Sequence, residues 1–242
     1  MAKVSAKNTI ILVNGYSLST YFTAYEGESS AGKISVQGFT DGSENSIPGL
    51  PTAHLQGDVL WDKTANTSFP LFRTLPTGHI TLIPEGYVLG NNTISLPFMQ
   101  GNYMVKGNPA GAVELGTINF ESYGNNVGIE QGWALHHGII TTTTTGTGFD
   151  DPSGGAVTAT CSGTLHIWDA TTTDTYVVKI QHSTTLGSGY SDLITFVANG
   201  TSVTSERIAV ASGTINRYRR VLATRTGSAG DTFGFSVHFQ HQ

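Results

Sequence analysis

Residues 157–168 read VTATCSGTLHIW, and residues 233–239 read FGFSVHF. Apolar and polar residues nearly alternate in both stretches, and β-branched and aromatic residues are frequent. A period of two places the apolar side chains on one face of an extended strand and the polar side chains on the other. Residues of these types also favour strands. Both stretches therefore predict β-strands with one face in a core.

Alternating apolar residues, with many β-branched and aromatic side chains, occur along most of the chain. Breaks rich in Gly and Asn separate the apolar segments, for example LGNN at 89–92, KGNPAG at 106–111 and TGSAGD at 226–231. Such residues supply the positive φ angles that tight turns require. No long amphipathic helix is evident, and the best helical candidates are residues 15–27 and 131–140. The sequence predicts an all-β fold.

Four short motifs occur twice in the same order, which indicates an internal duplication. The pairs are NGYSL (14–18) and QGWAL (131–135), GFTDGS (38–43) and GFDDPS (148–153), WDKTANTSF (61–69) and WDATTTDTY (168–176), and Ala110-Gly111…Phe120 and Ala229-Gly230…Phe239. We expect two tandem β-sandwich or barrel domains of similar topology, residues 1–122 and 127–242, joined by residues 123–126. One short flanking helix in each domain is compatible with this prediction. The alternative, that Gly-rich β domains share such fragments without duplication, stays open.

The charge pattern excludes a general nucleic-acid binder. The net charge is −5, whereas such a protein normally has a basic stripe. The cationic cluster is RYRR at 217–220, where Arg217 and Arg219 would share one face of a strand. It predicts a solvated strand end or an ion pair between subunits, with a phosphate-binding edge as the alternative. Only 12% of residues are charged, which suits many turns or large areas buried against other subunits.

Motifs of catalysis and cofactor binding are absent. The sequence contains no nucleophile elbow, Walker loop, dinucleotide fingerprint or H-E-x-x-H, so we expect neither an enzyme nor a cofactor. Cys161 is alone and is best interpreted as a small core residue. Asp150 and Asp151 offer oxygen ligands to Ca²⁺, but the matching first-half segment holds only Asp41 and Glu44, which does not support a site shared by both copies.

The histidines do not predict a metal site. His136 and His137 are adjacent and would point to opposite faces of a strand. His166, His182 and His238 fall on separate predicted strands of the second copy, where a cross-strand cluster is the alternative, but no ligand spacing rule links them.

The first residues, MAKVSAKNTIILVNG, contain an apolar run too short for a signal-peptide core or a membrane span. We therefore expect assembly in a host cytoplasm.

Three segments carry a resemblance to a known family. They are AKNTIILVNGYSLSTYFTAY (6–25), ISVQGFTDGSENSIPGLPTAHLQGDVLWD (34–62) and AVELGTINFES (112–122). The chain resembles the tail tube proteins, or major tail proteins, of long-tailed bacteriophages. The resemblance covers the first half of the chain well and the second half more loosely.

The resemblance implies a structural protein of the virion tail. Members of the family are β-sandwiches with a flanking helix that form hexameric rings, stacked into a hollow tube through which DNA leaves the particle. The implied partners are copies of the chain itself and the tape measure, tail tip and tail terminator proteins. DNA would pass without specific binding. Because the repeated motifs indicate a duplicated chain, a ring would contain three chains, or six with the second copy outside the tube.

The resemblance also implies which loops reach neighbouring subunits, those near 26–33 and 38–50. The candidate assembly loop is Asp41, Gly42, Ser43, Glu44 and Asn45.

Two other functions remain as alternatives. In a carbohydrate-binding or adhesin module, Trp61, Trp133 and Trp168 would form stacking platforms, whereas in a structural protein they would be core residues at strand ends. In a virion decoration protein, the second copy alone would bind a capsid or tail surface.

Overall fold

A computed structural model describes residues 8–36, 45–62, 68–74, 77–106, 115–123, 128–151, 157–171, 173–228 and 230–241. The chain divides into two compact units, each discontinuous in sequence. We call residues 1–19, 78–95 and 130–242 the sandwich unit, and residues 20–77 and 96–129 the arm unit. The predicted duplication into residues 1–122 and 127–242 stays a prediction.

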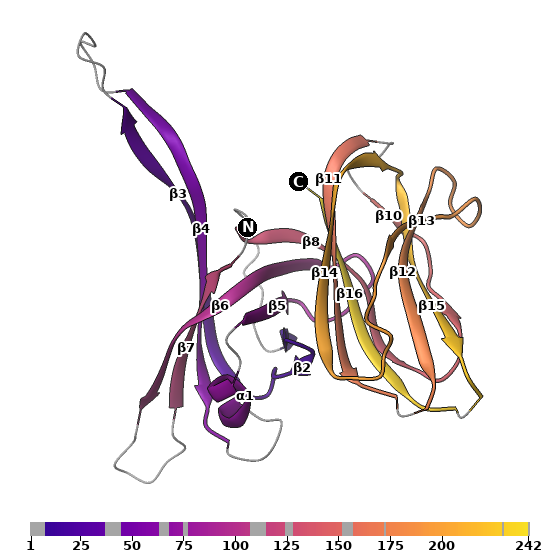
Figure 1. Cartoon of the computed structure of the whole chain (residues 1–242), viewed down its shortest axis with the longest axis horizontal. Coiled ribbons are helices and arrows are strands. Elements are labelled where there is room, and N and C mark those ends of the chain that lie inside the picture. The colour runs from indigo at the N-terminus through magenta and orange to yellow at the C-terminus, as the bar shows by residue number, and fades with distance from the viewer. Residues whose placement is uncertain are drawn as a thin grey trace. The chain divides into compact units, whose positions relative to one another are not determined.

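The first sheet of the sandwich unit contains both strands predicted from residues 157–168 and 233–239. Its order is β14 (Thr204–Ile215), β11 (Val157–Asp169), β16 (Phe233–His241), β8 (Glu130–Ile140), the start of β6 (Asn92–Lys106), β5 (Thr77–Ile83), β1 (Ile10–Val13) and β2 (Tyr16–Ser17) (Figure 1). β11 pairs antiparallel with both β14 and β16. It is therefore an inner strand of the sheet.

A second sheet covers one face of the first. It has the order β10 (Phe149–Asp150), β15 (Tyr218–Thr226), β12 (Thr175–Ser183) and β13 (Ser191–Thr195), and β9 (Thr144–Thr145) also pairs with β15. The core between the sheets includes Leu165, Ile167, Tyr176, Val178, Phe233, Phe235 and Phe239. The predicted alternation of residues 157–168 is confirmed, because Leu165 and Ile167 enter this core whereas Thr164 and His166 point to the other face.

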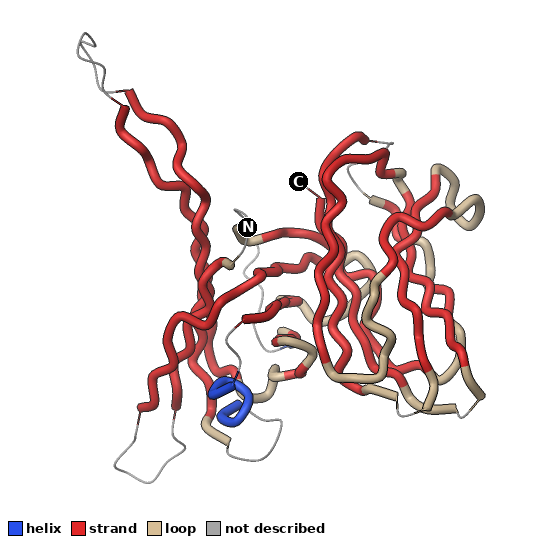
Figure 2. Tube along the Cα trace, in the orientation of Figure 1, coloured by secondary structure: helices blue, strands red, loops and turns tan. Residues whose placement is uncertain are grey.

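The described strands of the arm unit pair antiparallel, and one helix packs against them. Its elements are β3 (Phe22–Val36), β4 (Asn45–Leu60), α1 (Ser68–Thr74), the later part of β6, and β7 (Leu115–Ser122) (Figure 2). Phe72 of α1 is buried, and its ring centroid lies 6.4 Å from that of Phe22 and 6.0 Å from that of Phe120. Phe98 packs edge-on against Phe120 at 4.5 Å. This aromatic cluster covers one face of the sheet.

The all-β prediction is confirmed, but both helical candidates are wrong. Residues 15–27 lie mainly in β2 and β3, and residues 131–140 lie in β8. Asn14 and Gly15 have φ angles of 48° and 90° and form the two-residue turn between β1 and β2. Asn-Gly is the preferred sequence of such hairpin turns. The α-helix of the described residues is α1, which has Pro70 in its first turn, where no backbone donor is needed.

Candidate assembly surfaces

The longest hairpin of the arm unit extends beyond its sheet. β3 and β4 pair from Phe22–Val59 to Val36–Asn45, whereas β7 pairs with β4 only from His54 to Leu60. Residues 29–36 and 45–53 therefore form a ribbon with no third strand among the described residues, which we call the hairpin arm (Figures 1 and 2). An isolated two-stranded hairpin is marginally stable, and its open edges can pair with another chain. The hairpin arm is thus suited to contact a partner.

The candidate assembly loop connects the two strands of the hairpin arm. Asp41, Gly42, Ser43 and Glu44 lie outside the described residues. Asn45 begins β4, and its side chain is also outside the described part. The role of this loop in assembly stays a prediction.

The face of the arm-unit sheet away from the aromatic cluster is polar. In β4, Leu55 and Val59 are buried, whereas His54, Gln56 and Asp58 alternate with them and point to the other side. Directly paired residues of antiparallel strands share a face. Glu26, Glu28, Asn119 and Glu121 therefore join them, because these residues pair with Gln56, His54, Gln56 and His54, respectively. We call this surface the polar face.

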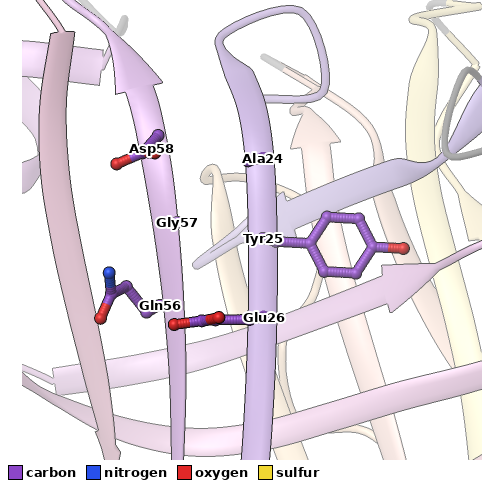
Figure 3. Close-up of a pocket in the computed structure, with 6 residues that line it drawn as sticks. All are labelled: Ala24, Tyr25, Glu26, Gln56, Gly57 and Asp58. Carbon is purple, nitrogen blue, oxygen red and sulfur yellow. The ribbon is translucent and has the colours of Figure 1, made fainter.

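Two shallow hollows lie on the arm-unit sheet. One, of about 160 Å³, is lined by residues 24–26 of β3 and 56–58 of β4. Figure 3 shows Glu26 directed towards Gln56, while Tyr25 points to the opposite side. The other, of about 400 Å³, is lined by Thr52, Ala53, His54, Gln56, Asn119, Glu121 and Ser122.

The polar face carries negative charge. Its described carboxylates are Glu26, Glu28, Asp58 and Glu121, and His54 is the ionisable base among its described side chains. Asp58 is held in place, since its Oδ1 accepts a hydrogen bond of 2.8 Å from the Thr117 hydroxyl. A surface of this sign repels phosphate groups. The polar face is therefore unsuited to holding nucleic acid tightly.

The acidic turn predicted as a Ca²⁺ candidate is paired with the arginine cluster instead. Asp150 accepts hydrogen bonds of 2.6 and 2.9 Å from Arg217, and Asp151 accepts one of 2.6 Å from Arg219. Each carboxylate thus already has a cationic partner within the sandwich unit. No group of His, Cys, Asp or Glu side chains that could hold a metal occurs in the part of the chain that the structure describes.

The third arginine of the cluster also has protein partners. Nε of Arg220 donates a hydrogen bond of 3.0 Å to Oε1 of Gln181, and its guanidinium lies 4.0 Å from the centre of the Tyr190 ring. The cluster pairs within the sandwich unit and does not form an open phosphate-binding edge.

Cys161 and two tryptophans pack inside the sandwich unit. Cys161 is buried in the core, and burial raises the pKa of its thiol, so it is a core residue as predicted. The Trp133 ring lies 5.7 Å from that of Phe149, and the Trp168 ring lies 4.5 Å from that of His137. Both tryptophans are partly buried and pack against these rings, Trp133 within β8 and Trp168 near the end of β11. Trp61, directly after β4, is half-buried.

The histidines gather more closely than the sequence indicates. His136 stacks on Phe235 at 4.2 Å and the His137 ring lies 4.5 Å from that of Trp168, while the Tyr87 ring lies within 6.5 Å of both histidines. His166 and His238 lie on neighbouring strands with ring centroids 6.0 Å apart, whereas His182 lies on β12 in the second sheet. A cross-strand cluster of these histidines stayed open in the sequence, because spacing along the chain does not tell which strands are neighbours.

The chain matches no protein-family model and no curated protein. Solved structures similar to it come from tail and tube assemblies. They include a virion of a native gene transfer agent particle (12% identity, TM-score 0.39, covering 51% of this chain and 96% of that chain) and the sheath–tube complex of an extracellular contractile injection system (13%, 0.41, 53% and 90%). A third is the tube-terminating cap of an anti-feeding prophage (10%, 0.42, 55% and 93%).

All three structures are of low identity to this chain and cover about half of it. At these TM-scores the similarity carries no conclusion about what the chain binds. No helix in the described ranges is long and apolar enough to cross a membrane.

Proposed function

We propose that the chain is a structural, non-enzymatic protein of a phage tail tube. Copies assemble in the host cytoplasm into rings, and the rings stack into a hollow tube of the virion tail through which DNA is delivered. The hairpin arm carries this proposal. Its backbone edges lack a third strand among the described residues, and a neighbouring subunit would satisfy them.

The polar face supports the same function. Glu26, Glu28, Asp58 and Glu121 would turn negative charge towards the bore. Because carboxylates repel DNA phosphates, the duplex would pass without adhering. Tape measure, tail tip and tail terminator proteins would complete the tail, and each ring would hold three chains with two copies of the domain, or six chains.

Negative-stain microscopy of the concentrated, purified protein tests this function. We expect stacked rings or tubes of the width of a phage tail, and the mass of one ring then distinguishes three chains from six. A monodisperse monomer that binds glycans would overturn the proposal in favour of a carbohydrate-binding module.

A further inference from the structure

Within the sandwich unit, His166 of β11 contacts the β1–β2 turn and β5. It lies on β11 with no exposed surface. Its Nδ1 is 3.2 Å from the backbone nitrogen of Gly15, and its Nε2 is 2.9 Å from the hydroxyl oxygen of Thr81 on β5. One imidazole ring thus contacts two elements that are distant in sequence.

These contacts determine the protonation state of His166. A backbone N–H can only donate, so Nδ1 of His166 must accept from Gly15 and carries no proton. The proton of the neutral ring is then on Nε2, which donates to Thr81. The Thr81 hydroxyl lies 3.0 Å from that of Ser95, which also accepts a hydrogen bond of 3.0 Å from Gln240. With a neutral His166 ring, every donor in this chain of hydrogen bonds therefore faces an acceptor.

The β1–β2 turn packs closely against Ile167 near the end of β11 and Thr204 at the start of β14. A Cβ atom on Gly15 would lie 2.5 Å from the carbonyl oxygen of Thr204 and 2.6 Å from that of Ile167. Beside it, Oδ1 of Asn14 accepts a hydrogen bond of 2.8 Å from Ser205. The turn therefore packs directly against the backbone of β11 and β14, with no space for a side chain at residue 15.

The titratable groups that act on His166 are histidines: His238 from β16, His79 from β5 and His137 from β8. Burial lowers the pKa of His166 well below its ordinary value, and the three neighbouring rings lower it further. The ion pair of Glu130 and Arg207 acts on His79. The surroundings thus favour the neutral ring.

We propose that His166 is an acid-sensitive latch. When Nδ1 binds a proton it becomes a hydrogen-bond donor that faces another donor, the Gly15 N–H, and the β1–β2 turn is released from β11. Two donors cannot share a hydrogen bond, so the turn must move away for the protonated ring to be accommodated. This is a property of the fold itself and does not depend on assembly into a tube.

The difference in the pKa of His166 between the closed and the open turn determines how the opening equilibrium depends on pH. Once the turn has opened, His166 regains an ordinary pKa of about 6.5. Since its pKa is lower in the closed form, the closed form is fully stabilised above that pH and loses stability as the pH falls. For one proton, the opening equilibrium constant rises about tenfold for each pH unit below about 6.5.

Amide hydrogen exchange measured from pH 7 to 4.5 tests the latch. We expect the protection factor of the Gly15 amide to be lower than those of Val178 and Ile180 in β12 at every pH, and to fall about tenfold per pH unit below about 6.5. Equal protection at all three positions would overturn the proposal, because the turn would then open only with the whole unit. A Gly15 protection factor that does not change with pH would also overturn it.

Two variants form a matched pair for this experiment. In His166→Asn, the amide oxygen occupies the place of Nδ1 and cannot titrate in this range, so Gly15 protection should become independent of pH. His182→Asn is the control, since Nδ1 of His182 likewise accepts a backbone hydrogen bond of 3.2 Å, from Asn216, but in the second sheet. This control should keep the wild-type pH dependence at Gly15.

A wild-type pH dependence in His166→Asn would overturn the latch. Should that variant fail to fold, the comparison of Gly15 with Val178 and Ile180 in the unmodified chain decides by itself.

Discussion

Asp151 and Arg219 form an ion pair of 2.6 Å whose side chains are only 3% and 1% exposed. One residue earlier, Asp150 pairs at the same distance with Arg217, but there the side chains are 48% and 45% exposed. Arg217 precedes the first residue of β15, whereas Arg219 lies within the strand, where its guanidinium is 4.4 Å from the centre of the buried Phe239 ring. The two pairs therefore allow a comparison of one interaction in the core and in water.

Asp151→Asn should strongly destabilise the chain, whereas Asp150→Asn should leave the unfolding midpoint unchanged within error. Burial lowers the pKa of Arg219 and the Asp151 carboxylate opposes that shift, so the variant leaves a buried cation without its counter-charge. Removing one partner of a buried pair typically costs about 3–5 kcal/mol. Urea unfolding of both variants measures this, and equal midpoints would contradict it.

Gly15→Ala should be more destabilising than Gly187→Ala. Both glycines have positive φ, 90° and 86°, so both substitutions carry the backbone strain of about 1–2 kcal/mol. Only at Gly15 would the new methyl group meet backbone oxygens, whereas at Gly187 nothing lies within 4 Å. We expect a further loss of about 2 kcal/mol at Gly15, measured by thermal or urea unfolding. Similar losses would show that the turn is not closely seated.

Thr164→Val should be neutral or stabilising, whereas Thr81→Val should be destabilising. The Thr164 hydroxyl is buried and has no hydrogen-bond partner among the described residues. The Thr81 hydroxyl connects His166 and Ser95, so its removal leaves buried polar groups unsatisfied at a cost of about 1–3 kcal/mol. Unfolding free energies of the two variants test this. A clear loss in Thr164→Val would show that its hydroxyl has a partner.

The free energy of unfolding should fall as the pH is lowered from 6.5 to 5, before carboxylates begin to protonate. Burial lowers the pKa of His238 to about 3 and that of His136 and His79 to about 4. The unfolded chain binds protons near pH 6.5 while the folded chain does not, so stability is complete above that pH and declines below it. Each histidine contributes up to about 1.4 kcal/mol per pH unit. Urea unfolding at several pH values should show this decline, and constant stability would exclude it.

Deleting residues 40–48 should leave a folded protein that no longer polymerises. The deletion shortens the hairpin arm at its connection and leaves the aromatic cluster around Phe72 intact. Circular dichroism reports the fold, and negative-stain microscopy reports assembly. Replacing residues 41–45 with Gly and Ser at unchanged length separates the role of the side chains from that of loop length. Loss of the fold would show that this segment is part of the core structure.

Sequence patterns correctly predicted the local features of this protein. The alternation in residues 157–168 predicted β11 and the face that enters the core between the sheets, including Cys161, but not that Thr164 and His166 on the opposite face are buried as well. Helices were predicted poorly. α1 is a short helix whose Phe72 packs against Phe22 and Phe120, and these contacts are made with residues far along the chain. Propensity alone is too weak to stabilise so short a helix.

The acidic turn and the arginine cluster are each recognisable in the sequence, but their pairing is not. Asp151 and Arg219 are 68 residues apart, and the register between β10 and β15 brings them together. Gly15 and His166 are 151 residues apart and meet only because the β1–β2 turn docks on β11.

Sequence patterns alone predict the all-β class, and they predict which side chains of a strand share a face. Both follow because alternation depends only on the geometry of a strand. The tertiary structure decided which strands are neighbours. The hairpin arm, the buried ion pair and the contacts of His166 all depend on that choice, since each arises from pairing or packing between residues that are remote in sequence.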